Sequence, residues 1–254
     1  MSKFKGSILI LALAVIVAVS AIVLIHQRYQ TISENISSDE NTPTISTSSP
    51  ATKPTPGSPA WAQKSTLLLS VPFTPQAPTG NWDKIHNEDC EEASSIMANA
   101  YYNGPHDAKL DPGYVEGQLT KLTDWELQNF GYNLDITSEE TVKMIAANYN
   151  LQTKILYSYT ENDIKNELQQ NHLVLIPENG QMLGNPNYKQ PGPVYHMLVI
   201  RGYTSSSIIT NDPGTRNGLN YSYSFNTLYN ANGDYDHSTS SVDLNKKNII
   251  IVFH

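Results

Sequence analysis

Residues 87–102 place the only cysteine of the chain at the first position of an amphipathic helix, which bears on both the fold and the chemistry. Apolar side chains recur there at helical spacing, namely Ala93, Ile96, Met97, Ala100 and Tyr101. Asp89 suits the N-cap position, and Glu92 completes the pattern of a capping box. Cys90 then begins the helix, where unpaired backbone N–H groups and the helix dipole favour a thiolate. Cys90 is therefore either a nucleophile or a small buried residue that happens to begin a helix.

The composition excludes several classes of protein. The 254-residue chain has a formal net charge of -8 and no cluster of Lys and Arg, so it lacks the basic surface of a nucleic-acid-binding protein. A single cysteine rules out an intramolecular disulfide framework and any multi-cysteine zinc site. The histidines include no HExxH motif and no close pair, so we expect neither a metal ion nor another cofactor.

Residues 1–29 are expected to form a short cytoplasmic tip and a transmembrane anchor. Lys3 and Lys5 precede an apolar run at residues 8–25, which can cross a bilayer as a helix of about 18 residues. The positive flank predicts a single-pass topology, with the rest of the chain on the extracytoplasmic side of the cell membrane. A cleaved signal peptide is the alternative, because small residues lie at 18–21. The length of the run favours the anchor.

Two further segments complete the expected organisation. Residues 30–66 are rich in Ser, Thr and Pro and show almost no apolar periodicity, so they predict a disordered linker. The folded domain is expected at residues 67–254. Its helical patterns come first, at about 90–103, 112–130, 138–149 and 161–170. Apart from a short strand at 67–71, the strand patterns follow, at 173–176, 194–203, 207–211, 219–223 and 248–253. This order predicts an α+β domain.

Two polar residues of the strand-rich half lie where they could serve Cys90. His196 begins one strong strand, and Asp212 follows the end of the next, with a predicted hairpin between them. In an antiparallel pair these two positions are neighbours. A Cys-His-carboxylate arrangement needs this geometry, because the imidazole accepts the thiol proton and the carboxylate orients the ring. Each residue also has a structural interpretation. His196 would then be a hydrogen-bonded histidine at the start of a strand, and Asp212-Pro213-Gly214 would be an ordinary turn.

Four segments, taken together and in this order, resemble the peptidase C39-like domain, a papain-like cysteine peptidase fold. They are VPFTPQ at 71–76, DCEEA at 89–93, HMLVI at 196–200 and NDPG at 211–214. The resemblance covers about residues 67–254 and implies N-terminal helices with a C-terminal antiparallel sheet. It also implies that Cys90 is the nucleophile and His196 the general base. Asp212 would orient His196, and the Gln76 side chain would contribute to the oxyanion hole.

The chain departs from the family pattern at two places. Many members have Gly-Pro after the cysteine, where this chain has Glu91-Glu92, and two carboxylates beside a thiol oppose its ionisation. Some C39-like proteins carry Cys-Glu-x-x-Ser, which Cys90, Glu91 and Ser94 match. Gln76 also lies further before the cysteine than the glutamine of papain-like enzymes does, and a solvated loop amide is its alternative interpretation.

These patterns lead to a membrane-tethered, extracytoplasmic cysteine hydrolase that cleaves peptide or isopeptide bonds of a peptide or protein substrate. A loop at 180–192 is expected to form one wall of the substrate cleft. The main alternative is a non-catalytic domain on the same fold that binds peptides or the cell wall. A cell-wall amidase of the NlpC/P60 type is a third possibility, but its usual Ser-Gly after the cysteine is absent.

Overall fold

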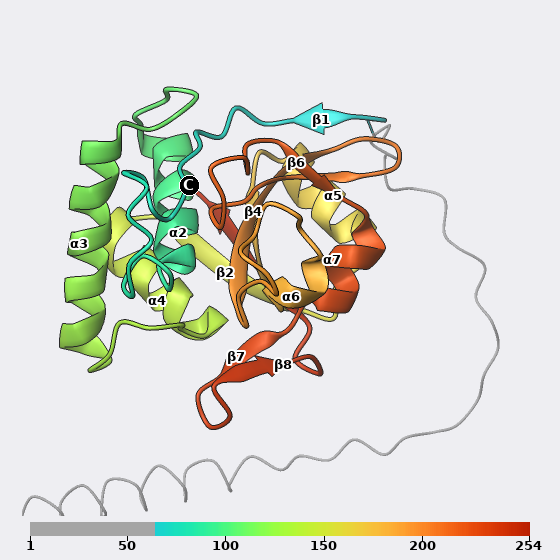
Figure 1. Cartoon of the computed structure of the whole chain (residues 1–254). Coiled ribbons are helices and arrows are strands. Elements are labelled where there is room, and N and C mark those ends of the chain that lie inside the picture. The colour runs from blue at the N-terminus through green and yellow to red at the C-terminus, as the bar shows by residue number, and fades with distance from the viewer. Residues whose placement is uncertain (1–63) are drawn as a thin grey trace, which may run out of the picture. The chain divides into compact units, whose positions relative to one another are not determined.

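The computed structural model describes residues 64–254 (Figure 1). The predicted anchor at 8–25 and the predicted linker, apart from its last three residues, lie outside this part of the chain. Between residues 64 and 254, no helix is both long and apolar enough to cross a membrane. The predicted domain boundaries therefore stay predictions.

An antiparallel sheet of seven strands forms the centre of the described domain. Six strands run in the order β2-β9-β3-β4-β5-β6, and β1 pairs with β4 outside this path. Their bounds are β1 (Leu67–Leu68), β2 (Gln152–Tyr157), β3 (Leu173–Glu178), β4 (His196–Tyr203), β5 (Ile208–Asn211), β6 (Tyr221–Tyr223) and β9 (Asn248–Phe253). A separate two-stranded sheet contains β7 (Asp234–Asp236) and β8 (Ser241–Asp243). Every residue of β3 and β4 is buried, which explains their nearly continuous apolar sequences.

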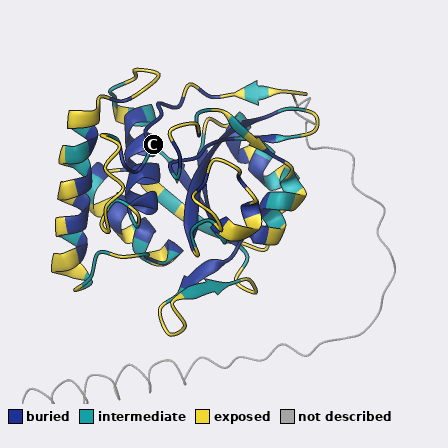
Figure 2. Cartoon of the chain, viewed as in Figure 1, coloured by how far each residue is buried: buried dark blue, intermediate teal, exposed yellow. Residues whose placement is uncertain are grey.

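Helices cover the sheet from both sides (Figure 1). Their bounds are α2 (Cys90–Asn103), α3 (Pro112–Asn129), α4 (Ser138–Tyr149), α5 (Glu161–Gln169), α6 (Gly180–Leu183) and α7 (Phe225–Ala231). α2 packs against β4, and α3 covers the other side of α2. As a result, every residue of α2 from Cys90 to Ala100 is buried, which Figure 2 shows as a dark blue helix.

The structure confirms a mixed fold of helices and an antiparallel sheet, with most helices before most strands. The predicted helix at 138–149 and strand at 248–253 have the predicted bounds, and the Thr137/Glu140 capping box is present. The strand β2 and the three-residue strands β7 and β8 were not predicted. β2 lies between two helices, and each of its residues is exposed or half-buried. It therefore lacks the apolar run of a buried strand.

The predicted capping box at the start of α2 is wrong. Asp89 is the N-cap residue, but its side chain makes no capping hydrogen bond. Glu92 does not reach back to it, because its carboxyl group is buried and interacts with Glu126 of α3. The packing of α3 on α2 thus overrides a local pattern.

Candidate active site

His196 and Asp212 are brought together by the hairpin of β4 and β5. The two strands pair antiparallel, with Val199 opposite Asn211, so the start of β4 lies beside the residue that follows β5. Nε2 of His196 is 2.9 Å from Oδ1 of Asp212, and both residues are buried. Since a carboxylate only accepts hydrogen bonds, Nε2 carries a hydrogen, which leaves Nδ1 as the nitrogen that can accept a proton. The predicted neighbourhood of these two residues is present.

Asp212 is held by more donors than the histidine alone. Its Oδ2 accepts hydrogen bonds from Asn185 Nδ2 at 2.9 Å, from the Tyr188 hydroxyl at 2.6 Å and from the Tyr223 hydroxyl at 2.9 Å. Burial opposes the ionisation of Asp212, but His196 and the two tyrosine hydroxyls outweigh it and lower the pKa of the carboxyl group. The carboxylate is therefore a fixed negative charge beside the imidazole.

The turn after Asp212 also shapes the site. The backbone N–H of Gly214 donates to Asp212 Oδ1 at 3.0 Å, and a Cβ at this glycine would come within 2.8 to 2.9 Å of the His196 ring. A Cβ at Gly218 would lie 1.8 Å from the Asp212 carbonyl oxygen, so only glycine fits there. The turn can close tightly around His196 because these two positions have no side chain.

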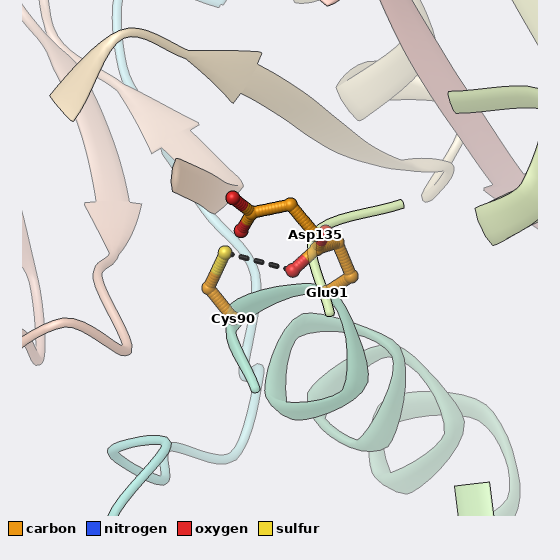
Figure 3. A group of neighbouring side chains, drawn as sticks. All are labelled: Cys90, Glu91 and Asp135. Atoms are coloured by element: carbon orange, nitrogen blue, oxygen red, sulfur yellow. Dashed lines mark hydrogen bonds between the residues drawn. The ribbon is translucent and has the colours of Figure 1, made fainter. Parts of the chain in front are cut away.

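Cys90 begins α2 as predicted, but its environment does not favour a thiolate. The residue is 2% exposed, and its Sγ donates a hydrogen bond to Oε2 of Glu91 at 2.9 Å (Figure 3). Burial raises the pKa of the Cys90 thiol well above its usual range, and the nearby carboxyl groups of Glu91 and Asp135 raise it further. These effects outweigh the helix dipole, so the expectation of a stabilised thiolate is wrong in this conformation.

The segments around Cys90 form a cluster of acidic side chains. Burial raises the pKa of Glu91 and of Glu92 well above the usual range of a carboxyl group, and neighbouring carboxyl groups raise both further. It also raises the pKa of Asp89 to about 7 and that of Asp135 to about 8. The predicted opposition of Glu91 and Glu92 to thiol ionisation agrees with the structure, because both carboxyl groups raise the pKa of the Cys90 thiol.

Cys90 and His196 lie on elements that pack together, but no hydrogen bond joins their side chains in the described part of the chain. The Ser94 hydroxyl of α2 donates to the carbonyl oxygen of Met197 at 3.2 Å, one residue after His196. This bond joins the N-terminal half of α2 to the start of β4. The sulfur, however, has Glu91 as its hydrogen-bond partner.

Gln76 lies beside the turn that follows Asp212, and its backbone N–H donates to the Pro213 carbonyl oxygen at 2.9 Å. Its side-chain Nε2 donates to the carbonyl oxygens of His86 and Asn87, both at 2.9 Å. Gln76 is 3% exposed, so it is not a solvated loop amide. An oxyanion role requires one of these two hydrogen bonds to be exchanged for substrate, and this role stays a prediction.

A cavity of about 730 Å³ lies beside these residues. Its lining includes Gln76, Asp135 and Gly214. Asp135 lies beside Cys90, and Gly214 lies in the turn that packs against the His196 ring. The loop predicted to form one wall of the cleft contributes Asn187, Tyr188, Lys189 and Gly192.

Sequence reasoning missed five residues of the site: Glu91 as the thiol's partner, Asp135, and the three residues that hold Asp212 through its Oδ2. Asn185 and Tyr188 belong to the long loop before His196, and their polar character was the only available signal. The sulfur and the carboxylate oxygens of Cys90, Glu91 and Asp135 lie within 4.8 Å of one another, a spacing that would admit a cation. An acidic cluster alone does not establish a metal site, and the thiol hydrogen bond accounts for the contact.

Comparison with known proteins gives one family and several solved structures, two of which are described here. Residues 68–240 match the model of the Peptidase_C39 like family. A Bacillus anthracis protein described as a C39-like peptidase aligns at 15% identity with a TM-score of 0.49, over 75% of this chain and 98% of that one. UfSP from C. elegans aligns at 11% identity with a TM-score of 0.35, over 74% of this chain and 34% of that one. Among curated proteins, none matches the chain.

Proposed function

Because the chain belongs to the peptidase C39-like family, we propose that it is a cysteine hydrolase that cleaves peptide or isopeptide bonds. One observation carries the proposal: the buried His196–Asp212 hydrogen bond lies at the start of β4, the strand that packs against the helix beginning with Cys90. The cavity is lined by sequence neighbours of His196 and Asp212, namely Tyr195 and Gly214, and not by Cys90, His196 or Asp212 themselves. An imidazole oriented by a buried carboxylate is the arrangement that a thiol nucleophile needs.

In the proposed reaction, Cys90 attacks the carbonyl carbon of the scissile bond, and a thioester forms as the amine leaves. His196 is the general base, and Asp212 holds it in the tautomer that leaves Nδ1 free to accept a proton. The Gln76 amide and the free backbone N–H groups at the start of α2 are the candidate donors to the oxyanion. Water then hydrolyses the thioester and restores the thiol.

Cleavage of a mixed pool of synthetic peptides and isopeptides tests this function. Full-length protein should produce fragments that mass spectrometry detects, and a thiol-reactive peptide should form an adduct at Cys90. Cys90→Ala should lose both signals. If the protein yields neither fragments nor an adduct while it is folded, the hydrolase function is wrong.

A non-catalytic binding domain is the second candidate, and the environment of the sulfur favours it. The pKa of Cys90 is raised by burial and by acidic neighbours, and its hydrogen-bond partner is Glu91 rather than His196. Such a domain would retain peptide ligands in the cavity without cleaving them. Binding of the peptide pool that is unchanged in Cys90→Ala, without products, would support this candidate.

The proposed location is the outer side of the cell membrane, with the apolar run at residues 8–25 as a single-pass anchor. The Lys3 and Lys5 flank supports this orientation. Full-length protein should fractionate with membranes, and proteolysis within residues 31–60 should release a soluble domain. A mature protein that begins after about residue 21 and is free in the medium would indicate a cleaved signal peptide instead.

A further inference from the structure

Two carboxyl groups line the cavity on the side of Cys90. They belong to Glu88, which precedes α2, and to Asp135, which precedes α4. A carboxyl oxygen of Asp135 lies within 4.8 Å of the Cys90 sulfur, and Figure 3 shows the two side chains close together. A substrate group that reaches these carboxyl groups is therefore adjacent to the bond that Cys90 attacks.

The two carboxyl groups form a hydrogen-bonded pair. Burial and the charge of Glu88 raise the pKa of Asp135 to about 8. Burial also raises the pKa of Glu88, but the hydrogen bond from Asp135 and the charge of Lys84 oppose this rise. Asp135 therefore holds the proton of the pair and donates it to Glu88, which carries the negative charge. The pair can attract a cation without ionisation of Asp135, and oxygen lone pairs of both groups can still accept hydrogen bonds.

The positive side chains nearby leave this charge unpaired. Between residues 64 and 254, no Lys or Arg forms an ion pair with Glu88 or Asp135. Lys84 acts on Glu88 only from an exposed position. Lys189 and Arg216 line the same cavity, but they are exposed and belong to the loop before β4 and to the turn after β5. The charge of the pair is thus left for a group that enters the cavity.

A buried hydroxyl without a partner adds an independent observation. Tyr195 lines the cavity and is 2% exposed, and its hydroxyl makes no hydrogen bond to any described residue. Burial raises the pKa of this hydroxyl well above its usual range, and the acidic groups beside Cys90, including Glu91 and Asp135, raise it further, so the hydroxyl lies near them. An unpaired buried hydroxyl costs free energy, which favours a ligand that pairs with it.

We propose that Glu88, Asp135 and Tyr195 form a subsite for a primary ammonium group of the substrate, an inference that rests on the proposed hydrolase function. An ammonium group has three N–H donors and one positive charge. Glu88 supplies the opposite charge, and oxygens of Asp135 and Tyr195 accept the other two hydrogen bonds. The ammonium group belongs to a residue at the scissile bond or next to it, either as a lysine side chain or as the free amine of an N-terminal residue.

A bound ammonium group also assists the Cys-His reaction. Burial and the acidic groups beside Cys90 oppose its ionisation, and the ammonium group brings a positive charge to the same place. The substrate thus supplies a charge that favours the thiolate, while the thiol proton still goes to His196.

Matched synthetic peptides test the subsite. Each pair differs only by acetylation of one amine, at a lysine side chain in one series and at the N-terminus in the other, and the lysine is moved along the peptide. Full-length protein should cleave a free amine near the scissile bond with a kcat/KM at least about tenfold above that of its acetylated partner, because acetylation removes a charged hydrogen bond. The series that shows the preference identifies the source of the amine.

Variants connect the preference to the named residues. Glu88→Gln removes the charge and should abolish the preference, and Tyr195→Phe removes only the hydroxyl and should reduce the preference about threefold. Glu139→Gln, at an exposed position of α4, is the matched control and should keep it. If Glu88→Gln does not fold, Asp135→Ala withdraws the hydrogen bond to Glu88 and should also reduce the preference.

The outcomes separate the subsite from the proposed function. Equal kcat/KM for free and acetylated amines in both series, or a preference that Glu88→Gln and Asp135→Ala retain, would overturn the subsite while the hydrolase function stands. If the wild-type protein cleaves no peptide, the hydrolase function falls, and the affinity of Cys90→Ala for the same pairs, measured by fluorescence anisotropy, decides on the subsite. Tighter binding of the free amines would then support it, and equal binding would overturn it.

Discussion

Nε2 of His196 and Oδ1 of Asp212 lie 2.9 Å apart, and neither residue is more than 1% exposed. The remaining oxygen of Asp212 is occupied by three donors, among them the hydroxyls of Tyr188 and Tyr223. Asp212 is therefore a fixed acceptor with a lowered pKa, and it determines which nitrogen of His196 can act as a base.

Asp212→Asn should reduce kcat by about 10⁴-fold, because an amide that donates to Nε2 forces the wrong tautomer of His196. The measurement is the rate of peptide cleavage alongside the thermal unfolding temperature. Asp107→Asn, at an exposed position, is the control and should change neither. A variant that unfolds at the same temperature and cleaves at the wild-type rate would show that Asp212 does not orient the base.

Cys90→Ala and His196→Ala should each abolish cleavage while the fold persists. The double variant should be little slower than either single one, because residues that act as one unit are not additive. Rates of the three variants in one assay, with circular dichroism to check folding, provide the comparison. Losses that multiply would mean that the two side chains act in separate processes.

Gln76→Ala should lower kcat by about 10² to 10³ with little change in KM, if its amide stabilises the oxyanion. The same amide holds the carbonyl oxygens of His86 and Asn87, so the variant also frees that loop. Asn81→Ala, an exposed position in the same loop, is the control for loop mobility. A rise in KM at constant kcat would indicate that Gln76 only anchors the loop.

Gly214→Ala should displace the His196 ring, because the new Cβ would come within 2.8 Å of it. We expect a loss of at least about tenfold in kcat, since a misplaced base costs rate even when the fold persists. Gly117→Ala is the control, because nothing lies within 4 Å of a Cβ there. Wild-type kinetics in Gly214→Ala would mean that the turn does not define the ring position.

Asp135 should make the domain less stable as the pH rises. Its pKa is raised from 3.8 to about 8, mainly by burial and by Glu88, so the folded chain binds more protons than the unfolded chain between these values. Stability contributed by the protonated carboxyl group is therefore complete at low pH and is lost between about pH 4 and 8. Asp135→Asn should raise the unfolding temperature at pH 8 by at least about 3 °C and change it little at pH 4.

The control for this prediction is Asp124→Asn, at an exposed position of α3. It should leave the difference in unfolding temperature between the two pH values as in the wild type. If Asp135→Asn shows the wild-type difference as well, the carboxyl group is not held protonated by burial.

The sequence by itself determined the features that depend on neighbours along the chain. Apolar periodicity and helix-capping residues predicted the helix at 138–149, and the punctuation of the strand patterns predicted the hairpin that brings His196 beside Asp212. The start of α2 at Cys90 was predicted in the same way. These features follow from backbone preferences over a few residues, which periodicity and turn residues report directly.

Only the tertiary structure decided the protonation and the partners of the site residues. Cys90 begins a helix, as the sequence predicts, but burial and the carboxyl groups of Glu91 and Asp135 raise the pKa of its thiol and so reverse the expected effect of the helix dipole. The hydroxyls that hold Asp212 come from positions 188 and 223, which no local pattern links to it. The cost of burying a charge depends on everything packed around it, so segments far apart in sequence must be placed before the chemistry of one side chain is known.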